Sequence, residues 1–126
     1  DRLEAVGLVD DQASADALVR ARFAGSGASV RALRELLVRK GLDASTIERA
    51  LSQIDREDEV ERAAQLVESK RRALAGVPRD TAYRRLNSML ARKGYSPSVA
   101  SAVVREALDE WGDQGDHAQE EWQWGL

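Results

Sequence analysis

Apolar residues recur at every third or fourth position along most of the chain, and the strict alternation typical of β-strands is missing. Within residues 30–40, for example, Val30, Leu33, Leu36 and Leu37 fall on one side of a helix. Charged residues occupy the other side, and similar spacing returns in the later segments. The pattern therefore predicts an all-α protein.

An internal repeat organises the predicted helices. The Arg-Lys-Gly sequence of residues 39–41 returns at residues 92–94, an offset of 53, and the apolar positions around it are kept at the same offset. Upstream, Ala15 matches Ala63 at an offset of 48, and the apolar residues three positions later match as well. The second copy therefore has five more residues between its first and second helices, and we expect a loop to contain them.

Local signals mark where the helices of each copy end and begin. Gly41 and Gly94 are predicted to adopt the left-handed conformation that ends a helix. Asp43 and Ser96 are predicted N-caps, and Pro97 suits the first helical position because its missing N–H has no intrahelical acceptor there. The sequence thus predicts helices at 30–40, 44–54 and 97–111, with inter-helix loops at 24–29 and 75–80.

The repeat divides the chain into modules of three helices. Residues 12–58 and 59–111 form one module each, and residues 1–11 resemble the end of a preceding module, with Gly7 as its helix stop. Residues 112–126 form an acidic tail that carries Trp122 and Trp124, whereas Trp111 is expected to close the last core. Modules of this size are marginally stable alone, so we expect them to stack into an elongated, bent array.

The composition excludes several classes of protein. No run of residues approaches the roughly 18 apolar positions of a membrane span. The chain has no cysteine, which excludes disulfides, thiolate metal sites and cysteine nucleophiles. We therefore expect a soluble, cytoplasmic protein without a cofactor, and a monomer.

Charge is unevenly distributed although the net charge is only −3. Residues 62–105 carry ten basic and two acidic side chains, whereas residues 106–126 carry seven acidic side chains and no Lys or Arg. Because physiological salt screens each field within about 8 Å, the basic segment can form a positive face despite the acidic total.

Basic residues are consequently the main candidates for binding. Those that end the second helix of each copy also complement a helix dipole, so both explanations stay open for them. The cluster around residues 70–85 is harder to explain locally, because its cations repel one another, and it suits phosphates or an acidic protein surface. The candidate residues are Arg31, Arg34, Arg39, Lys40, Lys70, Arg71, Arg72, Arg79, Arg84, Arg85, Arg92 and Lys93.

Several motifs in the repeat resemble the RecX family of RecA regulators. They are Leu-x-x-Leu-Leu-x-x-Lys-Gly at residues 33–41, its counterpart at 86–94, Gly-Leu-Val-Asp-Asp at 7–11 and Ala-Arg-Phe at 21–23. The similarity covers residues 1–110. Most of the family's first module is absent from this sequence, and the tail from residue 112 is no part of the family's pattern. The resemblance implies a non-enzymatic, all-α protein that binds RecA filaments on single-stranded DNA in their helical groove. It also implies restraint of recombinase, ATPase and coprotease activity in recombination, DNA repair and the SOS response.

Other site chemistries are weaker predictions. Tyr83, Tyr95 and Phe23 could stack on bases, but both tyrosines occupy apolar repeat positions and are better explained as core residues with solvated hydroxyls. Asp113, His117 and Glu121 have metal-ligand spacing on a helix, although neighbouring glycines disfavour that helix. No nucleophile with a base or phosphate-binding loop is evident, so we predict neither a catalytic residue nor a metal site.

Two alternative functions remain open. The second and third helices resemble a helix-turn-helix, which would suit a DNA-binding protein, although the third helices carry few basic residues apart from Arg49 and Arg105. Weak direct DNA binding is also compatible with the regulator. An adaptor whose acidic tail is the active element would lose its function on deletion of residues 112–126.

Overall fold

The computed structural model describes the backbone of residues 2–124 and the side chains of residues 11–112. Over that range the backbone forms six helices and no strand, which confirms the all-α prediction. The helices are α1 (Arg2–Gly25), α2 (Val30–Arg39), α3 (Ala44–Leu51), α4 (Arg56–Glu68), α5 (Arg79–Arg92) and α6 (Pro97–Trp124).

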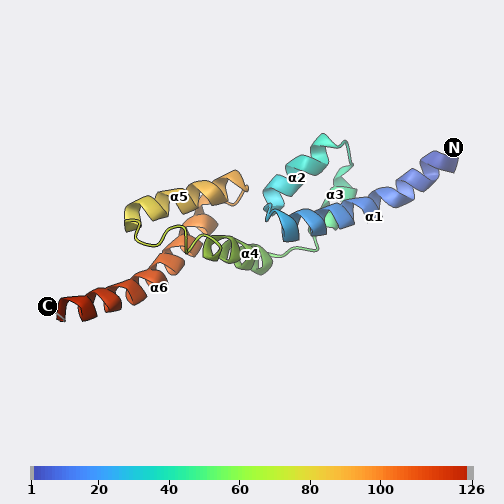
Figure 1. Ribbon diagram of the computed structural model, residues 1–126. Helices are drawn as coiled ribbons and strands as arrows, with labels where there is room; N and C mark the ends of the chain where they lie inside the picture. Colours follow the sequence, from blue (N-terminus) through green and yellow to red (C-terminus); the bar gives the residue numbers. More distant parts are fainter. Residues whose placement is uncertain (1, 125–126) are drawn as a thin grey trace.

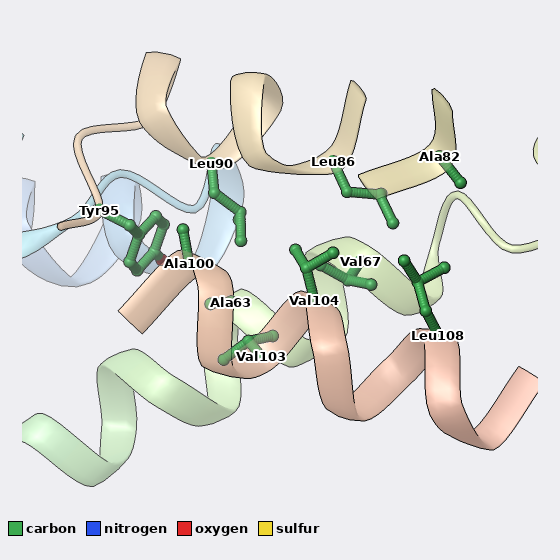
Figure 2. Packing of buried hydrophobic residues seen from close by; sticks show 10 residues of the cluster. All are labelled: Ala63, Val67, Ala82, Leu86, Leu90, Tyr95, Ala100, Val103, Val104 and Leu108. Carbon is green, nitrogen blue, oxygen red and sulfur yellow. The ribbon is translucent and has the colours of Figure 1, made fainter. Parts of the chain in front are cut away.

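The helices pack as two bundles of three, one after the other along an elongated molecule (Figure 1). Helices α1, α2 and α3 form the first module, and α4, α5 and α6 form the second. Each module has its own core, which Figure 2 shows for the second, where Leu86 and Leu90 of α5 face Val104 of α6. The predicted tandem arrangement of three-helix modules is therefore present.

The predicted helix ends are largely confirmed. Gly41 and Gly94 have φ angles of 83° and 97°, in the left-handed region that favours glycine. The carboxylate of Asp43 accepts a 2.8 Å hydrogen bond from the Thr46 amide, and this bond lowers the pKa of Asp43. Pro97 begins α6 as expected.

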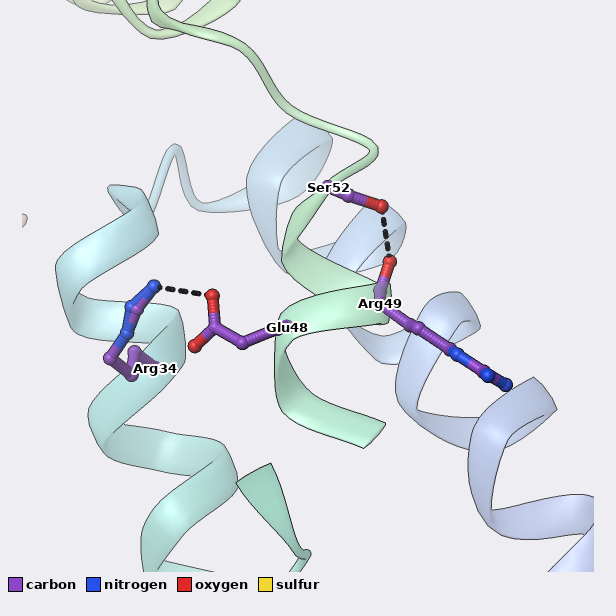
Figure 3. Close-up of polar contacts among 4 residues, drawn as sticks. All are labelled: Arg34, Glu48, Arg49 and Ser52. Carbon is purple, nitrogen blue, oxygen red and sulfur yellow. Dashed lines mark hydrogen bonds and ion pairs between the residues drawn. The ribbon is translucent and has the colours of Figure 1, made fainter. Parts of the chain in front are cut away.

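Several boundaries differ from the prediction. Helix α1 continues through Gly7, because one glycine costs only about 1 kcal/mol within a long helix. Helix α3 ends at Leu51, before Ile54, where the Ser52 hydroxyl donates a 2.6 Å hydrogen bond to the Arg49 carbonyl (Figure 3). Whether residues 1–11 belong to a preceding module stays a prediction.

The second module also departs from the predicted boundaries. Its first helix begins at Arg56, where Asp55 and Asp58 form a reciprocal capping box. The connection to α5 runs over residues 69–78, with turns at 69–76, so it begins six residues before the predicted loop at 75–80. Helix α6 continues past Trp111 to Trp124, although glycines were expected to end it. The side chains of Trp122 and Trp124 lie outside the described residues.

The two modules meet through hydrogen bonds to the backbone of the loop at residues 26–29. The Lys93 ammonium donates to the Ser26 carbonyl at 2.6 Å, and the Lys93 carbonyl accepts from the Ser29 amide at 3.0 Å. The Tyr95 hydroxyl donates to the Gly27 carbonyl at 2.9 Å. This corrects the expectation of a solvated Tyr95 hydroxyl, because Tyr95 is buried and its hydroxyl lies in the contact between modules.

Two charged side chains of α4 complete this contact by capping helices of the first module. Glu59 accepts a 2.9 Å hydrogen bond from the amide of Val30, the first residue of α2. Arg62 donates to the carbonyls of Phe23, Ala24 and Gly25, the last residues of α1. Helix ends leave such amides and carbonyls without intrahelical partners, and each charge has the sign that its helix dipole favours. The first module thus depends on the second for partners at two helix ends.

Replacing Tyr95 with phenylalanine is expected to destabilise the protein by about 1–3 kcal/mol, because the Gly27 carbonyl would lose its hydroxyl donor at a buried site. Urea unfolding of the wild type and the Tyr95→Phe variant measures the difference. A free energy of unfolding unchanged by the substitution would show that this hydrogen bond contributes nothing.

The same pair of proteins is expected to differ in alkaline solution. Burial raises the pKa of Tyr95 from 10.0 to about 12. Between these two pH values the unfolded chain loses the tyrosine proton while the folded protein keeps it, so folding stability decreases as the pH rises. The free energy of unfolding of the wild type should therefore fall by up to about 1.4 kcal/mol per pH unit more than that of Tyr95→Phe. Parallel stability curves for the two proteins would contradict it.

Candidate basic groove of the second module

A groove of about 720 Å³ lies between α5 and the turns at residues 69–76. Its cations are Lys70, Arg84, Arg85 and Arg92, all of them exposed side chains. Apolar groups of the lining come from Ala73, Leu74, Leu86 and Met89, and Ser88 adds a hydroxyl. Among the described residues, no carboxylate lines this basic groove.

The sequence of α5 explains how three of the cations come together. Arg84, Ser88 and Arg92 are spaced four residues apart, so they follow one another along one side of the helix. Arg85 and Met89 form a neighbouring row, and Leu86 is buried in the core below. Lys70 joins them from the turns that precede α5. The groove therefore needs both the helical spacing and the additional residues of the second copy.

The other predicted cations of this cluster lie outside the groove lining. Arg71 lies 5.7 Å from the ring centroid of Trp111 and 3.6 Å from Glu68. Arg79 forms a 2.6 Å ion pair with Asp109 of α6, and Arg72 is exposed in the turns. These contacts hold the turns and the start of α5 against α6, with Trp111 packed on the core as expected.

The first-module candidates and Lys93 are placed separately from the basic groove. Arg34 of α2 forms a 3.0 Å ion pair with Glu48 of α3, which Figure 3 shows bridging the two helices. Arg31 lies 3.8 Å from Glu35 one turn away, in a weak exposed pair. Arg39 and Lys40 are exposed at the end of α2, whereas Lys93 holds the Ser26 carbonyl. The structure therefore brings together four of the twelve predicted residues.

The candidate stacking aromatics and metal ligands do not line the basic groove. Tyr83 is half-buried between α5 and α6 with its hydroxyl 3.3 Å from that of Ser101, and this contact lowers the pKa of Tyr83. Phe23 packs on the first core. In the described residues no group of three His, Cys, Asp or Glu side chains could hold a metal ion. Asp113, His117 and Glu121 lie outside the described side chains.

The basic groove suits an extended anionic partner. Four cations around an open depression attract phosphates or carboxylates, and exposed side chains can adjust to either. The apolar lining was not predicted, although Lys70 with Leu74 and Arg85 with Met89 show a cation followed four residues later by an apolar side chain.

No helix in the described part of the chain is long and apolar enough to cross a membrane.

Comparisons with known proteins match both modules. Residues 10–51 match the family model described as RecX, second three-helix domain, and residues 57–104 match RecX, third three-helix domain. No solved structure matches.

Curated relatives carry the name regulatory protein RecX. The protein of Streptomyces coelicolor is 48% identical over 120 residues, covering 95% of this chain and 64% of the relative. The proteins of Thermobifida fusca and Mycolicibacterium smegmatis are 40% and 44% identical, covering 92% and 86% of this chain and 63% and 60% of theirs. The chain thus spans less than two thirds of the length of these relatives.

Proposed function

The chain belongs to the RecX family, and from this membership we propose that it regulates the RecA recombinase. It binds the filament that RecA forms on single-stranded DNA and restrains the recombinase, ATPase and coprotease activities of that filament. It acts by binding and not by catalysis, in the cytoplasm where recombination, DNA repair and the SOS response take place.

The basic groove is the observation that supports assigning the filament contact to the second module. Its four cations lie on a module that the third RecX domain model matches, and a nucleoprotein filament offers both phosphates and acidic protein surface. Arg31, Arg39, Lys40 and Arg72 are exposed cations outside the groove that add to the attraction. Arg34, Arg71, Arg79 and Lys93 support the fold through their contacts.

A RecA ATPase titration with the purified chain tests this function, run with and without single-stranded DNA at two salt concentrations. Inhibition is expected when filaments are present, and it should weaken at the higher salt because phosphate contacts release counterions. A chain that leaves the ATPase of the filament unchanged would contradict the proposal. Retention on DNA without any effect on RecA would favour the helix-turn-helix alternative instead.

A further inference from the structure

A second groove, of about 480 Å³, runs between α4 and α6 of the second module. Its apolar surface comes from Val60, Ala64, Val103 and Ala107, and Val60 is 38% exposed, which is unusual for a large apolar side chain here. Five glutamates and one arginine complete the lining. We call this depression the acidic groove, and it shares no lining residue with the basic groove.

The equivalent seam of the first module, between α1 and α3, is bridged by hydrogen bonds. The Gln12 amide donates to the Thr46 carbonyl at 3.2 Å and to the Asp16 carboxylate at 2.9 Å. The Gln53 amide donates to the Asp16 carbonyl at 3.1 Å, and Arg20 donates to the Gln53 side-chain oxygen at 2.8 Å. The side chains of Gln12, Arg20 and Gln53 thus join α1 to α3 and to the turn that follows α3.

The repeat shows what replaces these three side chains and Asp16 in the second module. At the offsets of 48 and 53, Gln12, Asp16, Arg20 and Gln53 correspond to Val60, Ala64, Glu68 and Glu106. All four replacements line the acidic groove. Gln12, Arg20 and Gln53 donate the hydrogen bonds that cross the first seam, whereas the side chains of Val60, Glu68 and Glu106 at their places have no donor. The same position in the fold is therefore bridged in one module and open in the other.

The open seam also has an excess of charge. The structure gives Glu68 a partner in Arg71 at 3.6 Å, whereas the other four glutamates form no ion pair within the described part of the chain. These are Glu57 and Glu61 of α4 and Glu106 and Glu110 of α6, so carboxylates flank the apolar surface from both helices. Such like charges repel one another until cations are brought between them.

We propose that the acidic groove docks a basic amphipathic helix of a partner protein. Helix α4 has 13 residues and is therefore about 20 Å long, enough to lie along about four turns of an added helix. Apolar residues of the partner at helical spacing cover Val60, Ala64 and Ala107, and its lysines or arginines meet the flanking carboxylates. This surface is independent of the filament contact proposed for the basic groove.

The test uses a fluorescent 14-residue peptide with leucines on one helical side and lysines on the other. The wild-type chain is expected to bind it. A bridged variant, with Val60→Gln, Ala64→Asp, Glu68→Arg and Glu106→Gln, gives the second seam the residues of the first and should bind at least about tenfold more weakly. Circular dichroism and thermal unfolding confirm that the variant keeps its fold.

Glu35→Lys is the matched control, because it changes the net charge by +2, as the bridged variant does, at an exposed site on α2. It should leave peptide affinity within about twofold. Glu61→Lys with Glu110→Lys reverses two exposed charges of the groove and weakens binding without altering any core residue. Absence of peptide binding, equal binding by the bridged variant, or equal binding of an acidic peptide would each overturn the proposal. Dimerisation lost in the bridged variant, without peptide binding, would make a second copy the occupant and also contradict it.

Discussion

A chain with Arg84 and Arg85 both changed to glutamate is expected to lose its inhibition of the RecA filament. The two side chains are exposed in the basic groove, so their reversal removes two favourable contacts and places like charges against the filament's anions. Like-charge contacts at an interface cost several kcal/mol, which corresponds to about a 100-fold or greater loss of affinity. ATPase inhibition titrated against variant concentration measures this loss.

The control for this reversal is Arg22→Glu with Arg49→Glu, which changes the net charge by the same amount at exposed residues of the first module. It should retain inhibition close to the wild type. The salt dependence gives a second readout, because removing two phosphate contacts reduces the slope of log affinity against log salt by about 1–2. Unchanged inhibition by the Arg84 and Arg85 variant at wild-type helicity would show that the basic groove does not contact the filament.

Replacement of Gly94 by alanine is expected to cost about 2–5 kcal/mol of folding stability. Its φ of 97° disfavours any side chain by about 1–2 kcal/mol. A Cβ at this position would also overlap the Ser29 hydroxyl and come within 2.8 Å of the Ala32 Cβ across the module contact, and such overpacking adds about 1–3 kcal/mol. Urea unfolding measures the total.

The repeat supplies the matched control for this glycine. Gly41 is the equivalent residue of the first module, with a φ of 83°, and apart from its chain neighbours no atom of the described residues lies within 4 Å of the place that an alanine Cβ would occupy. Gly41→Ala should therefore cost only the conformational part, about 1–2 kcal/mol. Equal destabilisation by the two substitutions would show that Gly94 has no role in joining the modules.

Helix ends were predictable from the sequence because their causes are local. Gly41, Asp43 and Pro97 act through their own backbone or through residues two or three positions away. The tandem modules followed from the repeat for a related reason, since equal spacing of apolar residues demands equal packing. The predicted boundaries were wrong where a local preference was weak, as at Gly7, through which α1 continues.

The candidate site was only partly predictable because charge in a sequence does not show which cations already have partners. Arg34 and Arg79 pair with Glu48 and Asp109, which lie 14 and 30 residues away in the chain. Lys93 reaches a carbonyl 67 residues away. Only the tertiary arrangement separates these from Arg84 and its neighbours in the basic groove.

The contact between modules also determines how the first module opens. The amides of Ser29 and Val30 belong to the first module in sequence, yet their acceptors, Lys93 and Glu59, belong to the second. In native-state hydrogen exchange, these two amides should therefore exchange with the free energy of opening of the second module. The Leu33 amide bonds to the Ser29 carbonyl within the first module, so it would stay protected while only the second module is open. It would exchange only when the first module itself opens.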